Sequence, residues 1–203
     1  MLTRIRRAAE QLGHLAHEAH GLAGRRPWRW LSVWFTDTFW AIASYRLSRS
    51  LYLLLGRGWS ALRVVLSPVL FLLRPWSGRC EINYHADIHR GLRILHPTLG
   101  VVISGKTVAG KYLVLVGGNC IGGRRALDQG EIRLGDNVLL GANACVMGPL
   151  TIGDNARIGA SALVVRDVPA DAVMRAAPAQ AAPAPAAADP DAGDARDATP
   201  EDR

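Results

Sequence analysis

Cysteine is scarce in this sequence, and its spacing excludes several classes of protein. The three cysteines, Cys80, Cys120 and Cys145, are an odd number and form no Cys-x-x-Cys pair. No group of Cys, His, Asp or Glu has the spacing of metal ligands, and no cleavable signal peptide is recognisable at the start. We therefore expect a cytoplasmic protein without a bound metal.

Long apolar runs are also missing. The segments 38–56 and 59–74 have helical composition, but Arg46 and Arg49 interrupt the first and Pro68 interrupts the second. Neither offers the roughly 20 uninterrupted apolar residues that a membrane-spanning helix needs. A helix that crosses a membrane is therefore disfavoured.

Acidic residues are rare in the first 80 positions, which carry 12 Arg against three acids, whereas residues 81–203 carry 12 basic and 14 acidic side chains. Residues 2–24 are expected to form an amphipathic helix. We place these apolar residues on one side of it: Ile5, Ala8, Ala9, Leu12, Leu15 and Ala16. After a break at Gly24 to Pro27, an aromatic-rich stretch runs from Trp28 to Trp40. Two interpretations stay open, namely helices with solvated arginine faces and contact of these helices with an anionic membrane surface.

A period of six residues dominates the second half of the chain. Six units run without a break from Leu134 to Pro169, and each opens with a branched aliphatic residue: Leu134, Leu140, Val146, Ile152, Ile158 and Val164. The fifth position of each unit is also apolar, and Gly, Asp, Asn and Ser fill the places between. This period fits neither an α-helix nor a plain amphipathic strand, but it fits short strands joined by tight corners in a solenoid.

The same spacing extends upstream through Ile82, Ile88 and Ile94, and again from Ile103 to Ile121 after a one-residue slip near Gly100. From Gly122 to Glu131 the aliphatic residues are missing, so we expect a loop outside the solenoid, where function often resides. From Ala176 onward the sequence consists mainly of Ala, Pro and Asp and cannot bury enough apolar area to fold. We therefore divide the chain into an α-helical region 1–79, a solenoid 80–178 and a disordered tail 179–203.

The stretch from Glu81 to Pro178 resembles the serine O-acetyltransferase branch of the hexapeptide-repeat acyltransferases. The resemblance depends on residues 82–88, on the run Gly91–His96, on the Gly122-Gly123 pair and on residues 158–162, with Tyr45-Arg46-Leu47 in a helix upstream. It implies a mainly β protein, a left-handed parallel β-helix of hexapeptide repeats preceded by α-helices. It also implies a homotrimer or a larger oligomer that transfers an acetyl group from acetyl-CoA to a hydroxyl. We expect no nucleic-acid partner.

The resemblance assigns His96 as general base and Glu81 as the carboxylate that orients it. A neutral imidazole can accept a hydroxyl proton near neutral pH because its ordinary pKa is about 6.5. A carboxylate on the other ring nitrogen fixes the tautomer and stabilises the imidazolium. Without the resemblance, His96 followed by Pro97 would be interpreted as a residue that shapes the turn.

Acetyl-CoA is expected in a groove between two subunits, where small side chains let its pantetheine arm approach the backbone. The residues assigned to this role are Gly122, Gly123, Gly141, Ala142, Gly159 and Ala160, and Arg157 is assigned to the phosphates. Arg157 could equally be an ordinary solvated charge.

The sequence departs from the family at the acceptor site. Gly130 stands where the family carries an arginine that binds the acceptor's carboxylate, and Glu131 stands where it carries a second histidine. We assign acceptor binding to Arg124, Arg125 and Glu131, because the two arginines could replace the missing cation. Three functions remain: acetylation of serine in cysteine biosynthesis, acetylation of a sugar or polysaccharide hydroxyl, and a non-catalytic trimeric scaffold.

Overall fold

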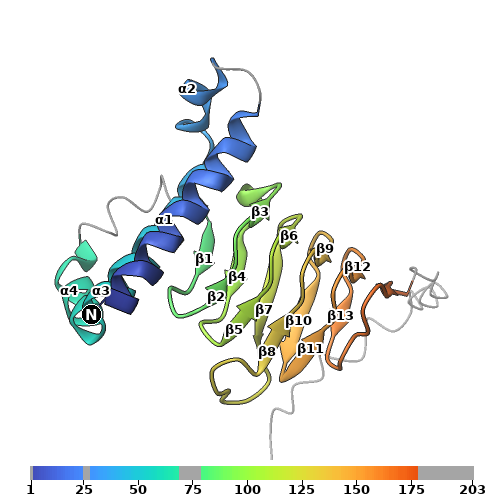
Figure 1. The fold of residues 1–203 in the computed structure, drawn as a ribbon. Coiled ribbons are helices and arrows are strands. Elements are labelled where there is room, and N and C mark those ends of the chain that lie inside the picture. Colours follow the sequence, from blue (N-terminus) through green and yellow to red (C-terminus); the bar gives the residue numbers. More distant parts are fainter. Residues whose placement is uncertain (1, 25–27, 69–78, 178–203) are drawn as a thin grey trace, which may run out of the picture.

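The computed structural model describes residues 2–24, 28–68 and 79–177 of the 203-residue chain. The expected disordered tail 179–203 therefore lies outside the described residues. Helices form one arm of the molecule, and a stack of short parallel strands forms the other part (Figure 1).

The strands build a left-handed parallel β-helix with three faces, which confirms the predicted fold class. Sheet A contains β1 (Cys80–Ile82), β4 (Val101–Ile103), β7 (Asn119–Gly123), β10 (Cys145–Gly148) and β13 (Leu163–Val164). Sheet B contains β2 (Asp87–Ile88), β5 (Thr107–Ala109), β8 (Ile132–Leu134) and β11 (Leu150–Ile152). Sheet C contains β3 (Arg93–Ile94), β6 (Val114–Leu115), β9 (Leu139–Leu140), β12 (Arg157–Ile158) and β14 (Val173–Met174).

The aliphatic residue that opens each unit points into one continuous core, as the period predicts. All six of these side chains between residues 134 and 164 are at most 4% exposed. Those of Leu140, Val146, Ile152 and Ile158 are fully buried. Full burial of one such side chain contributes about 1.5–3 kcal/mol, so the stacked aliphatics are the main source of stability.

The corner between sheets B and C explains the small polar residues of the repeat. The residues at this corner all have a positive φ of 58–60°: Tyr112, Asn137, Asn155 and Asp171. Asn tolerates this left-handed conformation better than most residues. The side chain of Asn137 donates to Asn155 (3.1 Å), and that of Asn155 donates to Asp171 (2.9 Å). The polar residues thus turn the chain and connect successive coils.

The helical arm consists of α1 (Leu2–Ala23), α2 (Arg29–Val33), α3 (Asp37–Leu55) and α4 (Arg57–Val65). The expected helix 38–56 agrees with α3. The expected start of the next helix at residue 59 is wrong, because Gly56 alone turns the chain (φ 58°) and α4 begins at the following residue. Residues 69–74 of that expected helix lie outside the described residues. In the described part of the chain, none of the helices has the length and hydropathy to cross a bilayer.

Helix α3 covers the open end of the first coil and holds it through side chains. Tyr45 donates its hydroxyl hydrogen to the carbonyl of Ala86 (2.9 Å) and accepts from the amide of Ile88 (3.2 Å). The guanidinium of Arg46 donates to the carbonyls of Ile88 (2.6 Å) and His89 (2.8 Å). Backbone groups that would otherwise end the solenoid unpaired therefore have partners.

Two arginines of α3 are buried, which corrects the interpretation that they belong to a solvated face. Arg46 is fully buried and forms an ion pair with Glu18 of α1 (2.6 Å), which is itself 5% exposed. Arg49 is 7% exposed and pairs with Asp87 of β2 (2.6 Å). These arginines are structural cations that join the helices to the β-helix.

The buried side of α1 also differs from the expectation. It consists of Ala8, Gln11, Glu18, Ala19 and Ala23, whereas Ile5 and Leu12 are about half exposed. The reason is electrostatic, because Gln11 and Glu18 must face Arg46 to pair its guanidinium inside the protein.

Candidate functional site

The chain passes from sheet C to sheet A at a corner that we call the C–A corner. It consists of residues 95–100, 116–118, 141–144 and 159–162, one segment from each successive coil. The backbone ladder continues through it: the His96 amide donates to the Val116 carbonyl (2.9 Å), and the Gly141 amide donates to the Ile158 carbonyl (2.7 Å). The segments therefore lie side by side along one edge of the prism.

His96 lies at the first-coil end of this corner. It immediately precedes the 3-10 helix η1 (Pro97–Leu99), whose Pro97 is buried, and its own side chain is exposed. The backbone of His96 is fixed by its bond to Val116 and by the Leu99 amide, which donates to the His96 carbonyl (3.2 Å). Among the described residues, no side chain forms a hydrogen bond or an ion pair with the imidazole. The ring is thus held in place through its backbone and free to interact with a ligand.

The next coil approaches His96 closely. A Cβ at Gly117 would lie 2.5 Å from the His96 carbonyl oxygen, and Gly117 has a φ of 139°. Only glycine fits this place without a shift of the backbone. The second coil therefore passes directly beside the backbone of His96.

Glu81 lies in β1 on the outer side of sheet A, where it pairs in register with Val102. Its neighbour Cys80 donates its thiol hydrogen to the carbonyl of Pro97 (3.5 Å), so β1 begins beside the turn that follows His96. Burial raises the pKa of the Cys80 thiol, which favours its neutral form. The Glu81 carboxylate and the His96 ring form no hydrogen bond with each other in the single chain. The dyad stays a prediction.

Four of the small residues assigned to the donor lie at the C–A corner, in line with His96. Gly141 is buried, and a Cβ there would lie 2.6 Å from the amide nitrogen of Ala160. Ala142 and Gly159 are half-buried, and Ala160 is exposed. At residues 141–142 and 159–160 the corner therefore presents backbone rather than large side chains to any ligand that lies along it.

Asn119 is a functional candidate that the sequence analysis did not single out. Its side chain is 1% exposed and lies behind the C–A corner. It accepts from the Gly117 amide (3.0 Å) and donates to the carbonyls of Gly141 (2.7 Å) and Ala144 (3.3 Å). A signal was available, because Asn119 occupies the fifth position of a repeat unit, which is apolar in the six regular units.

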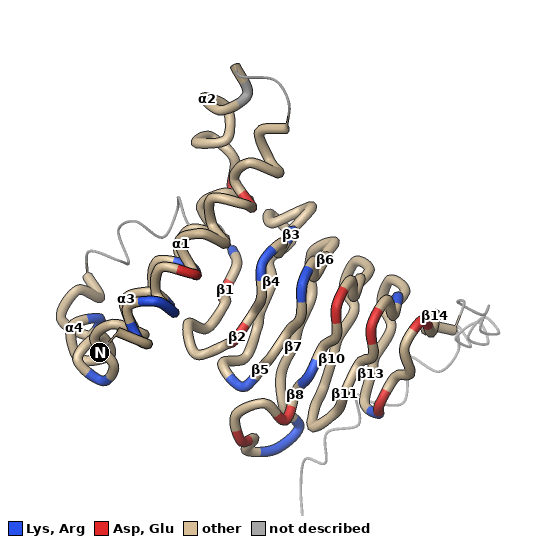
Figure 2. The backbone as a smooth tube through the Cα atoms, viewed as in Figure 1, with Lys and Arg blue, Asp and Glu red and all other residues tan. Residues whose placement is uncertain are grey.

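The Gly122-Gly123 pair and the residues assigned to the acceptor lie at the opposite edge of sheet A. Gly122 and Gly123 end β7, so the loop expected at residues 122–131 begins only at residue 124. The loop folds back toward the first coil, since the Gly130 amide donates to the Lys106 carbonyl (3.0 Å) and Gln129 donates to the His85 carbonyl (3.3 Å). Figure 2 shows its basic and acidic segments below the strands.

Inside the loop, Glu131 is already bound. Its carboxylate accepts from the Asp128 amide (2.6 Å) and pairs with the Arg125 guanidinium (2.7 Å), and these two partners hold the pKa of Glu131 below its ordinary value. The side chain of Arg124 is exposed and has no ion-pair partner among the described residues. Of the two arginines assigned to the acceptor, Arg124 is therefore the one available to an anion.

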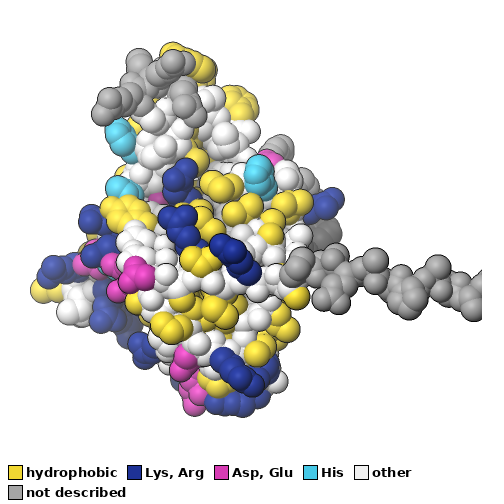
Figure 3. Space-filling view, turned by 90° about the vertical axis from the view of Figure 1, so that its right-hand side faces the viewer, with side chains coloured by type: hydrophobic (Ala, Val, Ile, Leu, Met, Phe, Trp, Pro, Cys, Tyr) yellow, Lys and Arg dark blue, Asp and Glu magenta, His cyan; other side chains and the backbone are white. Residues whose placement is uncertain are grey.

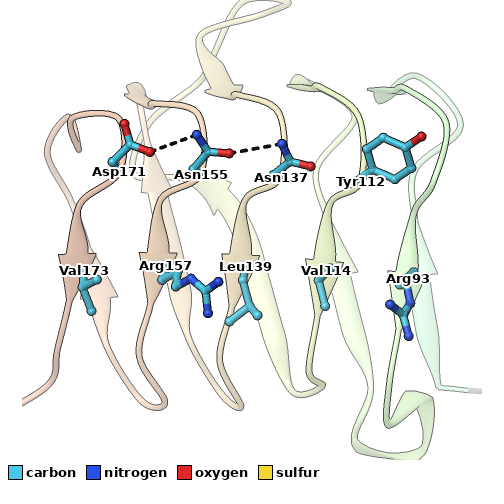
Figure 4. A pocket seen from close by; sticks show the side chains of 9 residues that line it. All are labelled: Arg93, Tyr112, Val114, Asn137, Leu139, Asn155, Arg157, Asp171 and Val173. Atoms are coloured by element: carbon cyan, nitrogen blue, oxygen red, sulfur yellow. Dashed lines mark hydrogen bonds between the residues drawn. The ribbon is translucent and has the colours of Figure 1, made fainter.

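Arg157 lies on a different face. It projects from β12 into a shallow cavity of about 560 Å³ on the outer side of sheet C, lined also by Arg93, Val114, Leu139 and Val173 (Figure 4). The corner residues Tyr112, Asn137, Asn155 and Asp171 border it along one side. Strands β6 and β9 lie between Arg93 and Arg157. The cavity therefore has two separate guanidinium groups, and the strand residues between and beside them are apolar.

One chain does not bring all assigned residues together. His96 and the Gly and Ala residues of the C–A corner lie along one edge of sheet A, and Arg124 and its loop lie along the other. A six-residue side of extended chain is roughly 20 Å wide. Any site that uses both edges must therefore combine two copies of the chain. In the described part of the chain, no group of three or more His, Cys, Asp or Glu side chains could hold a metal ion.

Comparison with known proteins identifies the repeat and the fold. Residues 131–166 match the bacterial transferase hexapeptide family (six repeats). No curated protein sequence matches the chain significantly. The match covers the regular repeats and not the earlier coils that carry His96.

Several solved structures of serine acetyltransferases are similar to this one. That of Neisseria gonorrhoeae in complex with serine is 26% identical with a TM-score of 0.68, and the match covers 89% of this chain and 72% of that one. The enzyme of Brucella abortus is 24% identical with a TM-score of 0.64, covering 88% and 71%. A serine acetyltransferase in complex with CoA is also 24% identical with a TM-score of 0.64, covering 85% and 69%. The resemblance inferred from the sequence is confirmed, and the chain has the architecture of a hexapeptide-repeat acyltransferase.

Proposed function

We propose that this protein is an acetyl-CoA-dependent O-acetyltransferase in which His96 is the general base. The observation that carries the proposal is the position of His96: an exposed imidazole that has no side-chain partner among the described residues, at the end of a corner that carries Gly and Ala at positions 141–142 and 159–160. The turn at this place is formed by the buried Pro97 and by backbone hydrogen bonds, so it does not require the ring. A solvent-exposed ring on a fixed backbone is suited to proton transfer.

The reaction requires one proton to move out and back. The acceptor's hydroxyl oxygen attacks the thioester carbonyl carbon while His96 takes the hydroxyl proton, which gives a tetrahedral intermediate and an imidazolium. The carbon–sulfur bond then breaks, and the imidazolium returns the proton to the departing thiolate. The products are an acetyl ester and the free thiol of CoA, and the imidazole is neutral again.

Glu81 is proposed to orient the ring. Its carboxylate is exposed and lies on the strand that begins beside Pro97, the residue that follows His96. A carboxylate hydrogen bond would fix one tautomer and stabilise the imidazolium.

We place the reaction between two copies of the chain in a homotrimer. Threefold closure of a three-sided prism lets the C–A corner of one copy face the loop 124–131 of the next, which joins the two edges that one chain keeps apart. The backbone at Gly141, Ala142, Gly159 and Ala160 would then receive the pantetheine arm, and Arg157 would meet a phosphate if the arm extends onto sheet C.

Serine is the first acceptor that we propose, which would place the enzyme in cysteine biosynthesis. The gonococcal structure with 26% identity was solved with serine, and Arg124 is available to bind a carboxylate. A hydroxyl of a sugar or polysaccharide is the second. The ion pair between Arg125 and Glu131 favours it, because this pair occupies one of the two arginines that were expected to bind the acceptor's carboxylate.

Release of CoA thiol from acetyl-CoA, measured with L-serine and with a panel of monosaccharides, tests the proposal. If serine is the acceptor, Arg124→Gln should raise KM for serine about tenfold or more and change kcat little. The reason is that the arginine would bind the serine carboxylate equally in the ground state and in the transition state. A sugar acceptor predicts turnover with a monosaccharide and little effect of Arg124→Gln. Absence of thiol release with every acceptor would instead support the third function, a catalytically silent trimeric scaffold.

A further inference from the structure

The far end of the helical arm exposes an unusual number of large apolar side chains. Helix α2 lies at the tip of the arm, away from the β-helix (Figure 1). Within eight residues, the exposed fractions are 65% for Trp28, 73% for Leu31 and 83% for Phe35, and Trp30 and Trp34 are exposed as well. Figure 3 shows hydrophobic side chains at the top of the molecule, where α2 lies. Five large apolar side chains at one tip are more than scattered surface residues account for.

These side chains lie along α2 and the turn that follows it. Trp28 and Trp34, which flank α2, also have helical φ and ψ, so Trp28 and Leu31 have the spacing i, i+3 of one helix face. Phe35 lies in the turn after α2, where its amide donates to the Ser32 carbonyl (3.0 Å). Val33, on another side, is 3% exposed and packs with Ala19, Ala23, Phe39 and Ala43. The tip is thus anchored through Val33 and presents Trp28, Leu31 and Phe35 outward.

The tip is rigid enough to present these side chains together. The ring of Trp34 packs edge-on against those of Phe39 (5.0 Å) and Trp40 (6.2 Å). The indole of Trp40 donates to the Trp34 carbonyl (2.8 Å). The contacts among Trp34, Phe39 and Trp40 therefore connect the end of α2 to the start of α3.

The sequence around the tip is mainly basic. Between residues 19 and 37 it contains three arginines, at 25, 26 and 29, and one acid, Asp37, which is exposed at the start of α3. Two of the three acids in the first 80 residues already pair with arginines, Glu10 with Arg6 and Glu18 with Arg46. Exposed Trp, Leu and Phe beside arginines are the composition of segments that lie in the headgroup region of an anionic bilayer.

We infer that the tip formed by residues 28–35 docks on an anionic lipid bilayer and inserts Trp28, Leu31 and Phe35 into the interface. The protein lies on the membrane through this short segment, and the β-helix stays in water at the other end of the molecule. Such docking brings the acyltransferase site near a membrane surface without a spanning helix.

Flotation with vesicles tests this inference on the full chain. Wild-type protein is expected to float with vesicles of phosphatidylcholine containing 30% phosphatidylglycerol (about a third anionic lipid) and to bind pure phosphatidylcholine more weakly. The triple variant Trp28→Ser, Leu31→Ser, Phe35→Ser is expected to lose roughly tenfold or more in partitioning. Lipids brominated near the headgroup should quench the tryptophan fluorescence of the wild type.

The matched control removes equally exposed apolar side chains from the other end of the arm. Val64 and Val65 of α4 are 73% and 75% exposed, and Val64→Ser, Val65→Ser should float like the wild type. Far-UV circular dichroism and thermal melting show whether each variant is folded. Equal flotation of both variants, or absence of flotation at any lipid composition, would overturn the inference. So would a concentration-dependent self-association that the triple variant loses, because the tip would then contact a second copy of the chain.

Discussion

The side chain of Asn119 connects three backbone groups behind the C–A corner. It is buried, and it joins the coil under His96 to the coil that carries Gly141. The Gly117 amide has no other hydrogen-bond partner among the described residues, whereas the carbonyls of Gly141 and Ala144 also accept from the backbone amides of Ala144 (3.1 Å) and Cys120 (3.3 Å). We regard Asn119 as a positioning residue that acts through the backbone rather than on a ligand.

Asn119→Ala should therefore reduce both stability and activity. Loss of the side-chain amide leaves the buried N–H of Gly117 unpaired, which costs about 1–3 kcal/mol of unfolding free energy. Urea denaturation measures this loss. The thiol-release assay, run at a temperature at which the variant is folded, should show a lower kcat.

Thr107 provides the control for Asn119, because it occupies the same inward position in another unit. It is fully buried and its hydroxyl has no partner among the described residues. Thr107→Val should be neutral or stabilising, since a methyl group replaces an unpaired hydroxyl of similar size. Equal destabilisation by both substitutions would mean that Asn119 has no special role at the corner.

At the scale of single residues, the sequence indicates which residues are candidates for the site better than it predicts which side chains contact each other. The resemblance singled out His96, whose exposed ring and fixed backbone agree with a site residue. The bond between Arg125 and Glu131 could not be predicted, because it depends on how a loop without aliphatic residues folds back. Asn119 could have been found from a polar residue at an inward position of the repeat.

Helix α1 is attached to the rest of the molecule by a buried charge network. Arg46 is fully buried and bonded to Glu18, Gln11 and two carbonyls of the first coil. Arg46→Met should cost about 3–5 kcal/mol, because it leaves the Glu18 carboxylate buried without its cation. Thermal melting followed at the helix band of circular dichroism measures the change.

The exposed ion pair between Arg6 and Glu10 of the same helix is the matched comparison. Its side chains are 85% and 54% exposed, and the closest atoms are 3.5 Å apart. Arg6→Ala should change stability by less than about 0.5 kcal/mol. If Arg46→Met has as small an effect as Arg6→Ala, the network does not hold the helices.

The contact of α1 with the first coil should weaken in acid. The ring of His14 packs near that of His89 (5.0 Å), and its Nδ1 is buried without a partner. Burial, followed by the nearby charges of Arg46, His89 and Arg90, lowers the pKa of His14 to about 4, and Asp87 opposes them. The folded protein therefore keeps His14 neutral in a range of pH in which the unfolded chain binds a proton.

Stability should consequently fall as the pH decreases from about 6.5 toward 4 and should level off below that range. The urea midpoint of His14→Gln should fall less over this range than that of the wild type. His17→Gln, at an exposed position of the same helix, should keep the wild-type slope. Identical slopes for all three proteins would show that His14 does not contribute.

At the scale of elements, periodicity predicted the strands and the length of α1 and α3. It failed for the buried side of α1, since a count of apolar residues cannot anticipate that Gln11 and Glu18 turn inward to meet an arginine of another helix. It also misplaced the start of α4, because Gly56 with its positive φ is enough to separate the two helices, whereas the sequence suggested a break over residues 56–58.

Apart from Glu81 and Arg157, the candidate site residues lie on two edges of one face of the molecule. His96 and the Gly and Ala corner lie at one edge of sheet A, and the loop with Arg124 lies at the other. The exposed side chains on the face between them include Val102 (47%) and Leu163 (64%), which is apolar area that a second copy could cover.

We therefore predict that the protein is a trimer in solution, with three times the mass of one chain in analytical ultracentrifugation. Val102→Arg, Leu163→Arg should shift the mass toward that of one chain, because the cations would be buried at the contact without partners. The variant should lose thiol release together with assembly. A monomeric wild type with full activity would refute the intersubunit site.

The proton transfer by His96 is the central claim, and the turnover number of a single variant tests it most directly. His96→Gln keeps the backbone of the turn and the exposed position but removes the base. We predict that kcat for thiol release falls about 10²- to 10⁴-fold while the melting temperature stays the same. A variant that retains kcat within about twofold of the wild type would contradict the account.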